Sequence, residues 1–198
     1  SGGVIVDFAI DAGATQANVG GQIELMSGAL NEFQEGPTVG SAFLVATRPP
    51  GLHYDYEVDS YLLAGFYNLQ HSLSDSLRVL HSLRLEYLDY DYANKHIVGN
   101  TKDDGTPCGF GGCLYSRPAS RTDSFTNVGA RLGVEKDLSA GLLYASVSSG
   151  FRPPQVTELY RLRGGQTIAD LNSERLTAFE AGFKNEAVAV AAFIERTR

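Results

Sequence analysis

Apolar and polar residues alternate with a period of two along most of the chain, whereas helical periodicity is weak. The alternation is cleanest in five segments: 3–10, 21–34, 77–88, 124–136 and 174–184. Three further segments alternate less clearly: 55–71, 141–149 and 187–198. Alternation of this kind is typical of β-strands with one apolar and one polar face. The pattern therefore predicts about eight strands.

The connections between these segments also alternate, in their length. Four are moderate or short: 11–19, 72–76, 137–140 and 185–186. Three are long: 35–54, 95–123 and 150–173. Strict alternation predicts an antiparallel up-and-down meander with all its long loops on one side, as in outer-membrane barrels. Greek-key crossings of a soluble sandwich would disturb this regularity.

Composition narrows the class of protein. With 43% hydrophobic and 20% charged residues and no long apolar run, the chain is neither disordered nor a helical membrane protein. Transmembrane strands remain compatible, because their short alternating spans give little hydropathy signal. The formal net charge of −7 argues against a nucleic-acid partner. No signal peptide opens the chain, so we expect either a removed leader or an internal fragment.

The polar faces of the strands carry many charges, which predicts a wet or plugged lumen if the apolar faces meet lipid. These residues are Glu24, Glu32, Arg78, Arg84, Glu86, Arg131, Glu135, Glu180 and Lys184. An eight-stranded barrel has room inside only for packed side chains, whereas a wide barrel around a polar plug accommodates such charges easily. Open sheet edges are not tolerated in lipid. We therefore expect further barrel strands on both sides, with residues 1–3 and 195–198 unpaired or frayed.

Aromatic residues gather beside the long connections, where we expect an interfacial girdle. They are Tyr54, Tyr56, Tyr87, Tyr90, Tyr92 and Phe125. In the loop "PCGFGGC", Cys108 and Cys113 are close enough in sequence for a disulfide. A metal site is the alternative, but two thiols without a neighbouring His supply only half of a tetrahedral zinc shell. The sequence thus favours the disulfide.

The segment 143–184 resembles the late barrel region of TonB-dependent outer-membrane receptors. The shared motifs occur in order: Tyr144-Ala145-Ser146, Gly150-Phe151-Arg152-Pro153-Pro154, Glu158-Leu159-Tyr160, Leu171 to Glu174, and Glu180-Gly182-Lys184. Neither proline can donate to a strand ladder, so we expect the strand to end there, at the outer rim, with Arg152 at the membrane interface. Upstream segments share the family's strand–turn–strand rhythm, and the resemblance covers most of the chain.

The resemblance implies an all-β fold, a partial transmembrane β-barrel in which 1–198 is a segment of a barrel of about twenty-two strands. The plug domain, the TonB box and the remaining strands are absent from this sequence. Such receptors bind a scarce nutrient at the outer membrane of Gram-negative bacteria, above all an iron–siderophore complex, and otherwise haem, cobalamin or a saccharide. They import it when the TonB complex pulls on the plug.

The implied partners are the TonB complex through the plug, the lipid bilayer and lipopolysaccharide, and a small ligand such as a ferric siderophore. The resemblance implies no cofactor and no catalysis. A small, complete eight-stranded outer-membrane barrel with a structural or enzymatic role is the alternative, although no residue constellation points to an enzyme.

Six residues of the expected long loops are candidates for ligand contact: Arg48, His53, Arg117, Arg121, Arg161 and Arg163. A guanidinium group binds carboxylate or catecholate oxygens in a bidentate manner, which suits an anionic chelate. Solvated arginines, or arginines that face lipopolysaccharide, are the alternative. His53 and His96 are candidates to contact haem iron or a metal chelate, and exposed loop histidines are the alternative.

Overall fold

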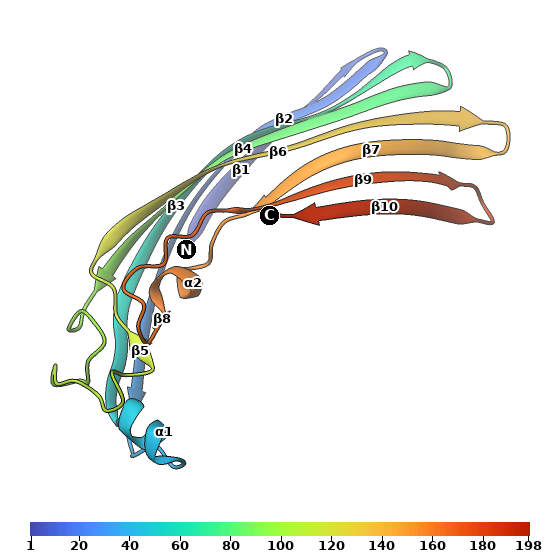
Figure 1. Cartoon of the computed structure of the whole chain (residues 1–198). Helices are drawn as coiled ribbons and strands as arrows, with labels where there is room; N and C mark the ends of the chain where they lie inside the picture. The colour runs from blue at the N-terminus through green and yellow to red at the C-terminus, as the bar shows by residue number, and fades with distance from the viewer.

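The chain folds into a single strongly curved antiparallel sheet in a computed structural model that describes all 198 residues (Figure 1). Its strands neighbour one another in chain order: β1 (Gly2–Ala12), β2 (Thr15–Gln34), β3 (Gly51–Ser74), β4 (Leu77–Asn94), β6 (Arg121–Leu138), β7 (Gly141–Arg152), β9 (Glu174–Lys184) and β10 (Ala189–Thr197). The connections hold four short elements: α1 (Ala42–Thr47), β5 (Tyr115–Ser116), α2 (Val156–Tyr160) and β8 (Leu162–Arg163). Neither helix has the length or apolarity to cross a membrane. The predicted all-β meander of about eight strands is confirmed.

Short and long connections alternate as predicted and lie at opposite ends of the sheet (Figure 1). The short turns comprise residues 13–14, 75–76, 139–140 and 185–188, and the long loops comprise 35–50, 95–120 and 153–173. The expectation of a moderate first connection at 11–19 is wrong, because β1 and β2 continue to a two-residue turn. Gly13 occupies that turn with a φ of 65°, a conformation that suits glycine.

The chain ends are paired, so the expectation of unpaired ends is wrong. The ladder of β1 and β2 begins at Gly2, and the ladder of β9 and β10 runs to Thr197. Beyond it, the backbone of Arg198 exchanges two hydrogen bonds with Arg175, of 2.8 and 2.9 Å. Pairing with one neighbour is enough to hold a terminal strand extended. The outer edges of β1 and β10 do not pair with each other, so the sheet is a partial barrel wall.

The two faces of the sheet separate apolar from charged side chains, as the alternation predicted. The strand registers place these exposed apolar residues together on the outer face: Val4, Val6, Phe8, Ile23, Leu25, Leu63, Leu85, Val128, Leu132, Val134, Leu143, Val147, Phe179 and Val190. The charged set lies on the inner face, where Arg84 pairs with Glu86 at 2.7 Å. A face this apolar is stable in contact with hydrocarbon and not with water.

The predicted aromatic girdle is wrong for most of its members. Tyr54, Tyr56, Tyr90 and Tyr92 are buried on the inner side of the sheet, where the long loops cover them. These four tyrosines occupy even positions, as the inward-facing charged residues of β2 and β4 do. The sequence pattern did not reveal that they face inward, because tyrosine suits both a membrane interface and a buried core. Tyr87 faces outward and is 40% exposed. The buried core of this chain is therefore an aromatic cluster at the long-loop end of β3 and β4.

The Glu-x-Gly-x-Lys motif of β9 has a packing explanation. Tyr144 on β7 lies opposite Gly182 and donates a 2.8 Å hydrogen bond from its hydroxyl to Glu180. A Cβ atom at Gly182 would lie 2.6 Å from that hydroxyl oxygen, so only glycine leaves room for the tyrosine. An aromatic ring laid over a strand glycine restores the contacts that the missing side chain would make. The motif fixes the β7–β9 register.

We predict that Leu132→Arg destabilises the folded protein by about 2–4 kcal/mol, because Leu132 lies midway along the apolar stretch of β6 and faces outward. The matched control is Gln70→Arg on the inner face. Gln70 lies at nearly the same level along the sheet as Leu132, because Gln70 pairs with Leu80 and Leu80 pairs with Gly133. The receptor that contains this chain is incubated at increasing urea concentrations, and the folded fraction is read from its heat-modifiable migration on a gel. This measurement gives the free energy of unfolding of both variants. Equal losses for the two variants would contradict the assignment of the faces.

Candidate functional site

The three long loops fold together over the inner face of the sheet. β5 pairs with β8 through Tyr115 and Arg163, which joins loop 95–120 to loop 153–173. The amide of Leu114 donates a 2.9 Å hydrogen bond to the carbonyl oxygen of Thr47, which joins the same loop to α1. The elements α2, β5 and β8 consequently lie on the concave side of the sheet (Figure 1). We call this assembly the loop layer.

Arg117 holds the loop layer together from within. It is only 1% exposed, and its guanidinium group donates to the carbonyl oxygens of Ile97, Thr101, Lys102 and His53. The bond to His53 measures 3.2 Å and reaches from loop 95–120 to β3. Backbone carbonyl oxygens that are buried need such donors, because an unpaired buried polar group is costly. The geometry thus gives Arg117 a structural role and leaves its guanidinium inaccessible to a ligand.

A disulfide closes the tip of loop 95–120. Cys108 and Cys113 are bonded, and the enclosed Gly109 donates a 3.2 Å backbone hydrogen bond to Ala46 of α1. The side chain of Asn100 donates a 2.6 Å hydrogen bond to the carbonyl oxygen of Cys113. The two thiols are therefore committed to a covalent link, and the tip is fixed against α1 by its backbone.

Loop 153–173 starts at the two prolines and turns inward directly. Arg152, the last residue of β7, faces the inside and pairs with Glu158 at 3.0 Å and Glu174 at 3.1 Å. The expectation that Arg152 lies at the membrane interface is wrong, because its even position on β7 shares the parity of Tyr144. The backbone amide of Gln155 donates a 2.7 Å hydrogen bond to Glu158, which closes the first turn of α2.

Tyr160 at the end of α2 anchors that loop to the sheet. Its ring is fully buried and stacks on Tyr92 of β4, with ring centroids 4.2 Å apart. Its hydroxyl donates a 2.8 Å hydrogen bond to Asp123 of β6. Burial, and secondly the bond to this carboxylate, raise the pKa of Tyr160, so the phenol stays protonated and keeps donating. The Glu-Leu-Tyr motif thus docks the loop layer on the inner face.

A basic hollow of about 400 Å³ is lined by residues of β2, β3, β5 and β8 and by Arg48, which follows α1. Arg48, Arg161 and Arg163 line it, and Glu32 is the carboxylate among them. One carboxylate oxygen of Glu32 lies 3.3 Å from Arg48, and the other accepts a hydrogen bond from Arg161. Arg163 makes no ion pair. The hollow therefore carries an excess of positive charge in a chain whose net charge is −7.

His53 forms part of the wall of the hollow without offering a free nitrogen. The side chain is 1% exposed and stacks on Tyr115 at 4.2 Å between ring centroids. Nε2 lies 2.7 Å from the carbonyl oxygen of Pro49, and Nδ1 lies 3.6 Å from Glu32. His96 lies 3.1 Å from Asp103, but burial, and secondly Arg117, lower the pKa of His96, so its ring is neutral at pH 7. Neither histidine presents an open metal-binding position.

The structure brings four of the six sequence candidates together in the basic hollow: Arg48, His53, Arg161 and Arg163. Arg117 lies beneath it, and Arg121 pairs with Asp123 at the end of β6 instead. Glu32 was not among the candidates for ligand contact. The sequence placed Glu32 only among the inward-facing charged residues. Its pairing with the arginines could not be predicted, because Arg48 and Arg161 are 16 and 129 residues away in the chain.

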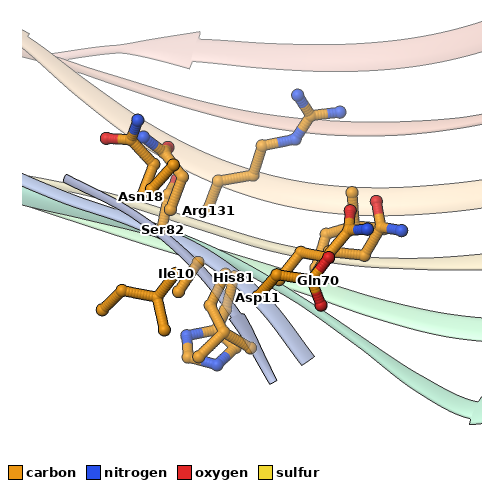
Figure 2. Close-up of a pocket in the computed structure, with 13 residues that line it drawn as sticks. Ile10, Asp11, Asn18, Gln70, His81, Ser82 and Arg131 are labelled. Carbon is orange, nitrogen blue, oxygen red and sulfur yellow. The ribbon is translucent and has the colours of Figure 1, made fainter. Parts of the chain in front are cut away.

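A second hollow lies on the bare inner wall at the short-turn half of the sheet. Figure 2 shows Asn18, Ser82 and Arg131 on one side of the strands, and Ile10 and His81 on the other. The first three belong to the inward-facing set, and the last two face outward with the apolar residues. Most of the residues that line this hollow are polar, but they lack the dense charge of the basic hollow.

A curved antiparallel meander, apolar outside, charged inside and capped by long loops at one end, is typical of the barrel wall of outer-membrane proteins. The family model described as "TonB dependent receptor-like, beta-barrel" matches residues 5–198. The chain belongs to this family of receptors and transporters, which is not a family of enzymes. Members of this family are receptors and transporters of the outer membrane of Gram-negative bacteria, and their transport depends on TonB. No curated protein matches the sequence at a significant level.

We predict that Arg117→Gln loosens the loop layer and leaves the barrel wall folded, since several buried carbonyl oxygens lose their donor at about 1–3 kcal/mol each. Trypsin added to intact cells should then cut the receptor after Lys102 faster than in the wild type, where Lys102 is half-buried. The control is Arg163→Gln, which removes an exposed arginine without an ion pair and should leave the rate of cleavage after Lys102 unchanged. Equal rates of cleavage after Lys102 in all three proteins would rule out the structural role of Arg117.

We predict that acid loosens α2. Arg152, and secondly the backbone amide of Gln155, lower the pKa of Glu158 below its ordinary value of 4.5. A lowered pKa in the folded state contributes stability that is complete above the ordinary value and is lost as the pH falls through the lowered one. Hydrogen-exchange protection factors for residues 155–163 should therefore drop between pH 7 and pH 3. In Glu158→Gln they should be low at both pH values, and a drop of the same size in that variant would refute the assignment.

Proposed function

We propose that the chain is a segment of the barrel domain of a receptor that imports an iron–siderophore complex, and that the basic hollow receives this ligand. The single observation that carries the proposal is the grouping of Arg48, Arg161 and Arg163 on the inner side at the long-loop end. Planar guanidinium groups suit the carboxylate, catecholate or hydroxamate oxygens of such chelates. The side chains of Arg48 and Arg161 are about half exposed, at 50% and 48%, so a ligand can reach them.

The position of the hollow supports the proposed function, as its positive charge does. Its walls come from the loop layer and from the ends of β2 and β3, and the aromatic core beneath supports them. A site held by such packing loses little conformational freedom when a ligand binds. Below it, polar residues of the inner wall such as Asn18, Ser82 and Arg131 would give the ligand further polar contacts toward the short-turn end.

The same proposal covers the rest of the assembly. The bare inner wall would face a plug domain, the outer face would contact the bilayer and lipopolysaccharide, and the TonB complex would act through the plug. Residues 1–198 would then supply eight strands of a larger barrel. A complete eight-stranded barrel is the second candidate, but it requires β1 to pair with β10, and these strands do not pair.

The test is uptake of radioactive iron by cells that carry the full receptor, supplied with a panel of catecholate, hydroxamate and carboxylate chelates. At least one chelate should be taken up, and the double variant Arg161→Gln/Arg163→Gln should reduce uptake about tenfold or more. This loss corresponds to about 1.4 kcal/mol or more, which two partly exposed charge contacts account for.

The matched control is Arg175→Gln, because Arg175 is an arginine of β9 with no ion pair and lies outside the hollow. Uptake by this variant should equal that of the wild type. Uptake of cobalamin or a saccharide, with no uptake of any iron chelate, would overturn the proposal. Expression that rises when iron is scarce is an independent expected outcome.

A further inference from the structure

We propose that Glu32 is a built-in anion that occupies the basic hollow in the free protein and restricts it to polyanionic ligands. The inference rests on the proposed function only in taking the hollow as the ligand site. It assigns to Glu32 a part in specificity, and it names the ligand class as a compact molecule with two or more carboxylate or equivalent anionic oxygen groups.

The contacts of Glu32 resemble those of a bound carboxylate. Oε1 lies 3.3 Å from Nη2 of Arg48 and 3.6 Å from Nδ1 of His53, while Oε2 accepts from Nη2 of Arg161. Two arginines from loops that are distant in the chain thus converge on one carboxylate. A ligand carboxylate in this hollow needs the same donors, because guanidinium groups are the cations there.

The tether gives Glu32 an advantage over free monoanions. A group held on the same scaffold acts with an effective concentration on the order of millimolar or higher. A carboxylate such as acetate offers no more contacts than Glu32 does, so it does not displace Glu32 at lower concentrations. Replacing Glu32 therefore requires a ligand with additional anionic groups.

Arg163 supplies the contact that such a ligand gains. It lines the same hollow and has no carboxylate partner. One anionic group of a polyanion pairs with Arg163 while Glu32 still holds Arg161, and a second group then takes the place of Glu32. The side chain of Glu32 is 22% exposed and keeps access to water, so it can swing out as a hydrated carboxylate.

The test measures binding of iron-free citrate and of acetate by calorimetry to the purified full receptor in detergent, at an ionic strength of about 0.15 M. Glu32→Gln keeps the shape of the side chain and removes its charge. We expect it to bind citrate about tenfold more tightly than the wild type and to bind acetate at concentrations where the wild type binds none. Adding Arg163→Gln should reverse the gain in citrate affinity.

The matched control is Glu24→Gln on the same strand and the same inner face. It removes the same charge about 27 Å away at ~3.4 Å per residue, which is well beyond the Debye length of ~8 Å. Its affinities should equal those of the wild type. Glu32→Asp, which keeps the charge on a shorter side chain, should give a citrate affinity between those of the wild type and Glu32→Gln.

Weaker or unchanged citrate binding in a correctly folded Glu32→Gln receptor overturns the inference, and so does equal acetate binding by all variants. Heat-modifiable migration establishes that each variant is folded. Because these measurements use neither iron nor transport, they separate this inference from the proposed function. Failure of iron uptake alongside the expected citrate result removes the cargo assignment and keeps the role of Glu32.

Discussion

The structure depends on one constraint, which is that each strand satisfies its backbone hydrogen bonds through its neighbours in chain order. Of 122 backbone hydrogen bonds, 102 lie within helices and strands, so the loops add little to the backbone network. In hydrocarbon no water replaces a missing partner, and an unbroken ladder is the stable way for strands to cross. The ladder fixes the register, and the register decides which side chains face lipid and which face the interior.

The long strands β3 and β4 extend the barrel wall far enough to support the basic hollow. β3 has 24 residues and β4 has 18, whereas a crossing strand needs only about nine to eleven. The excess projects beyond the crossing segment, and its inward-facing tyrosines form a surface on which loops pack. Tyr160 and Leu159 of α2 complete that core. The loop layer is thus held by aromatic burial, by Arg117 and by one disulfide, and it presents the basic hollow at a fixed place.

The charge of the basic hollow is opposite in sign to the net charge of the chain. A net charge of −7 would predict repulsion of anions, yet three arginines surround a single carboxylate at the long-loop end. Glu32 offsets part of their mutual repulsion and holds two of them in position. The hollow combines accessible cations with a tethered anion, and in the role that we propose this combination would select among anionic ligands by their number of charged groups.

The eight alternating strands, the placement of all long loops at one end of the sheet, the family and the Cys108–Cys113 pair could be predicted from the sequence, because they follow from local periodicity and short motifs. The arginines of the hollow could also be predicted as loop residues. Three features became visible only in the folded chain: the core formed by Tyr54, Tyr56, Tyr90 and Tyr92, the burial of Arg117, and the contact of Glu32 with Arg161. Parity along a strand is a local property, whereas the burial of a tyrosine or the pairing of an arginine depends on which distant loop folds over it.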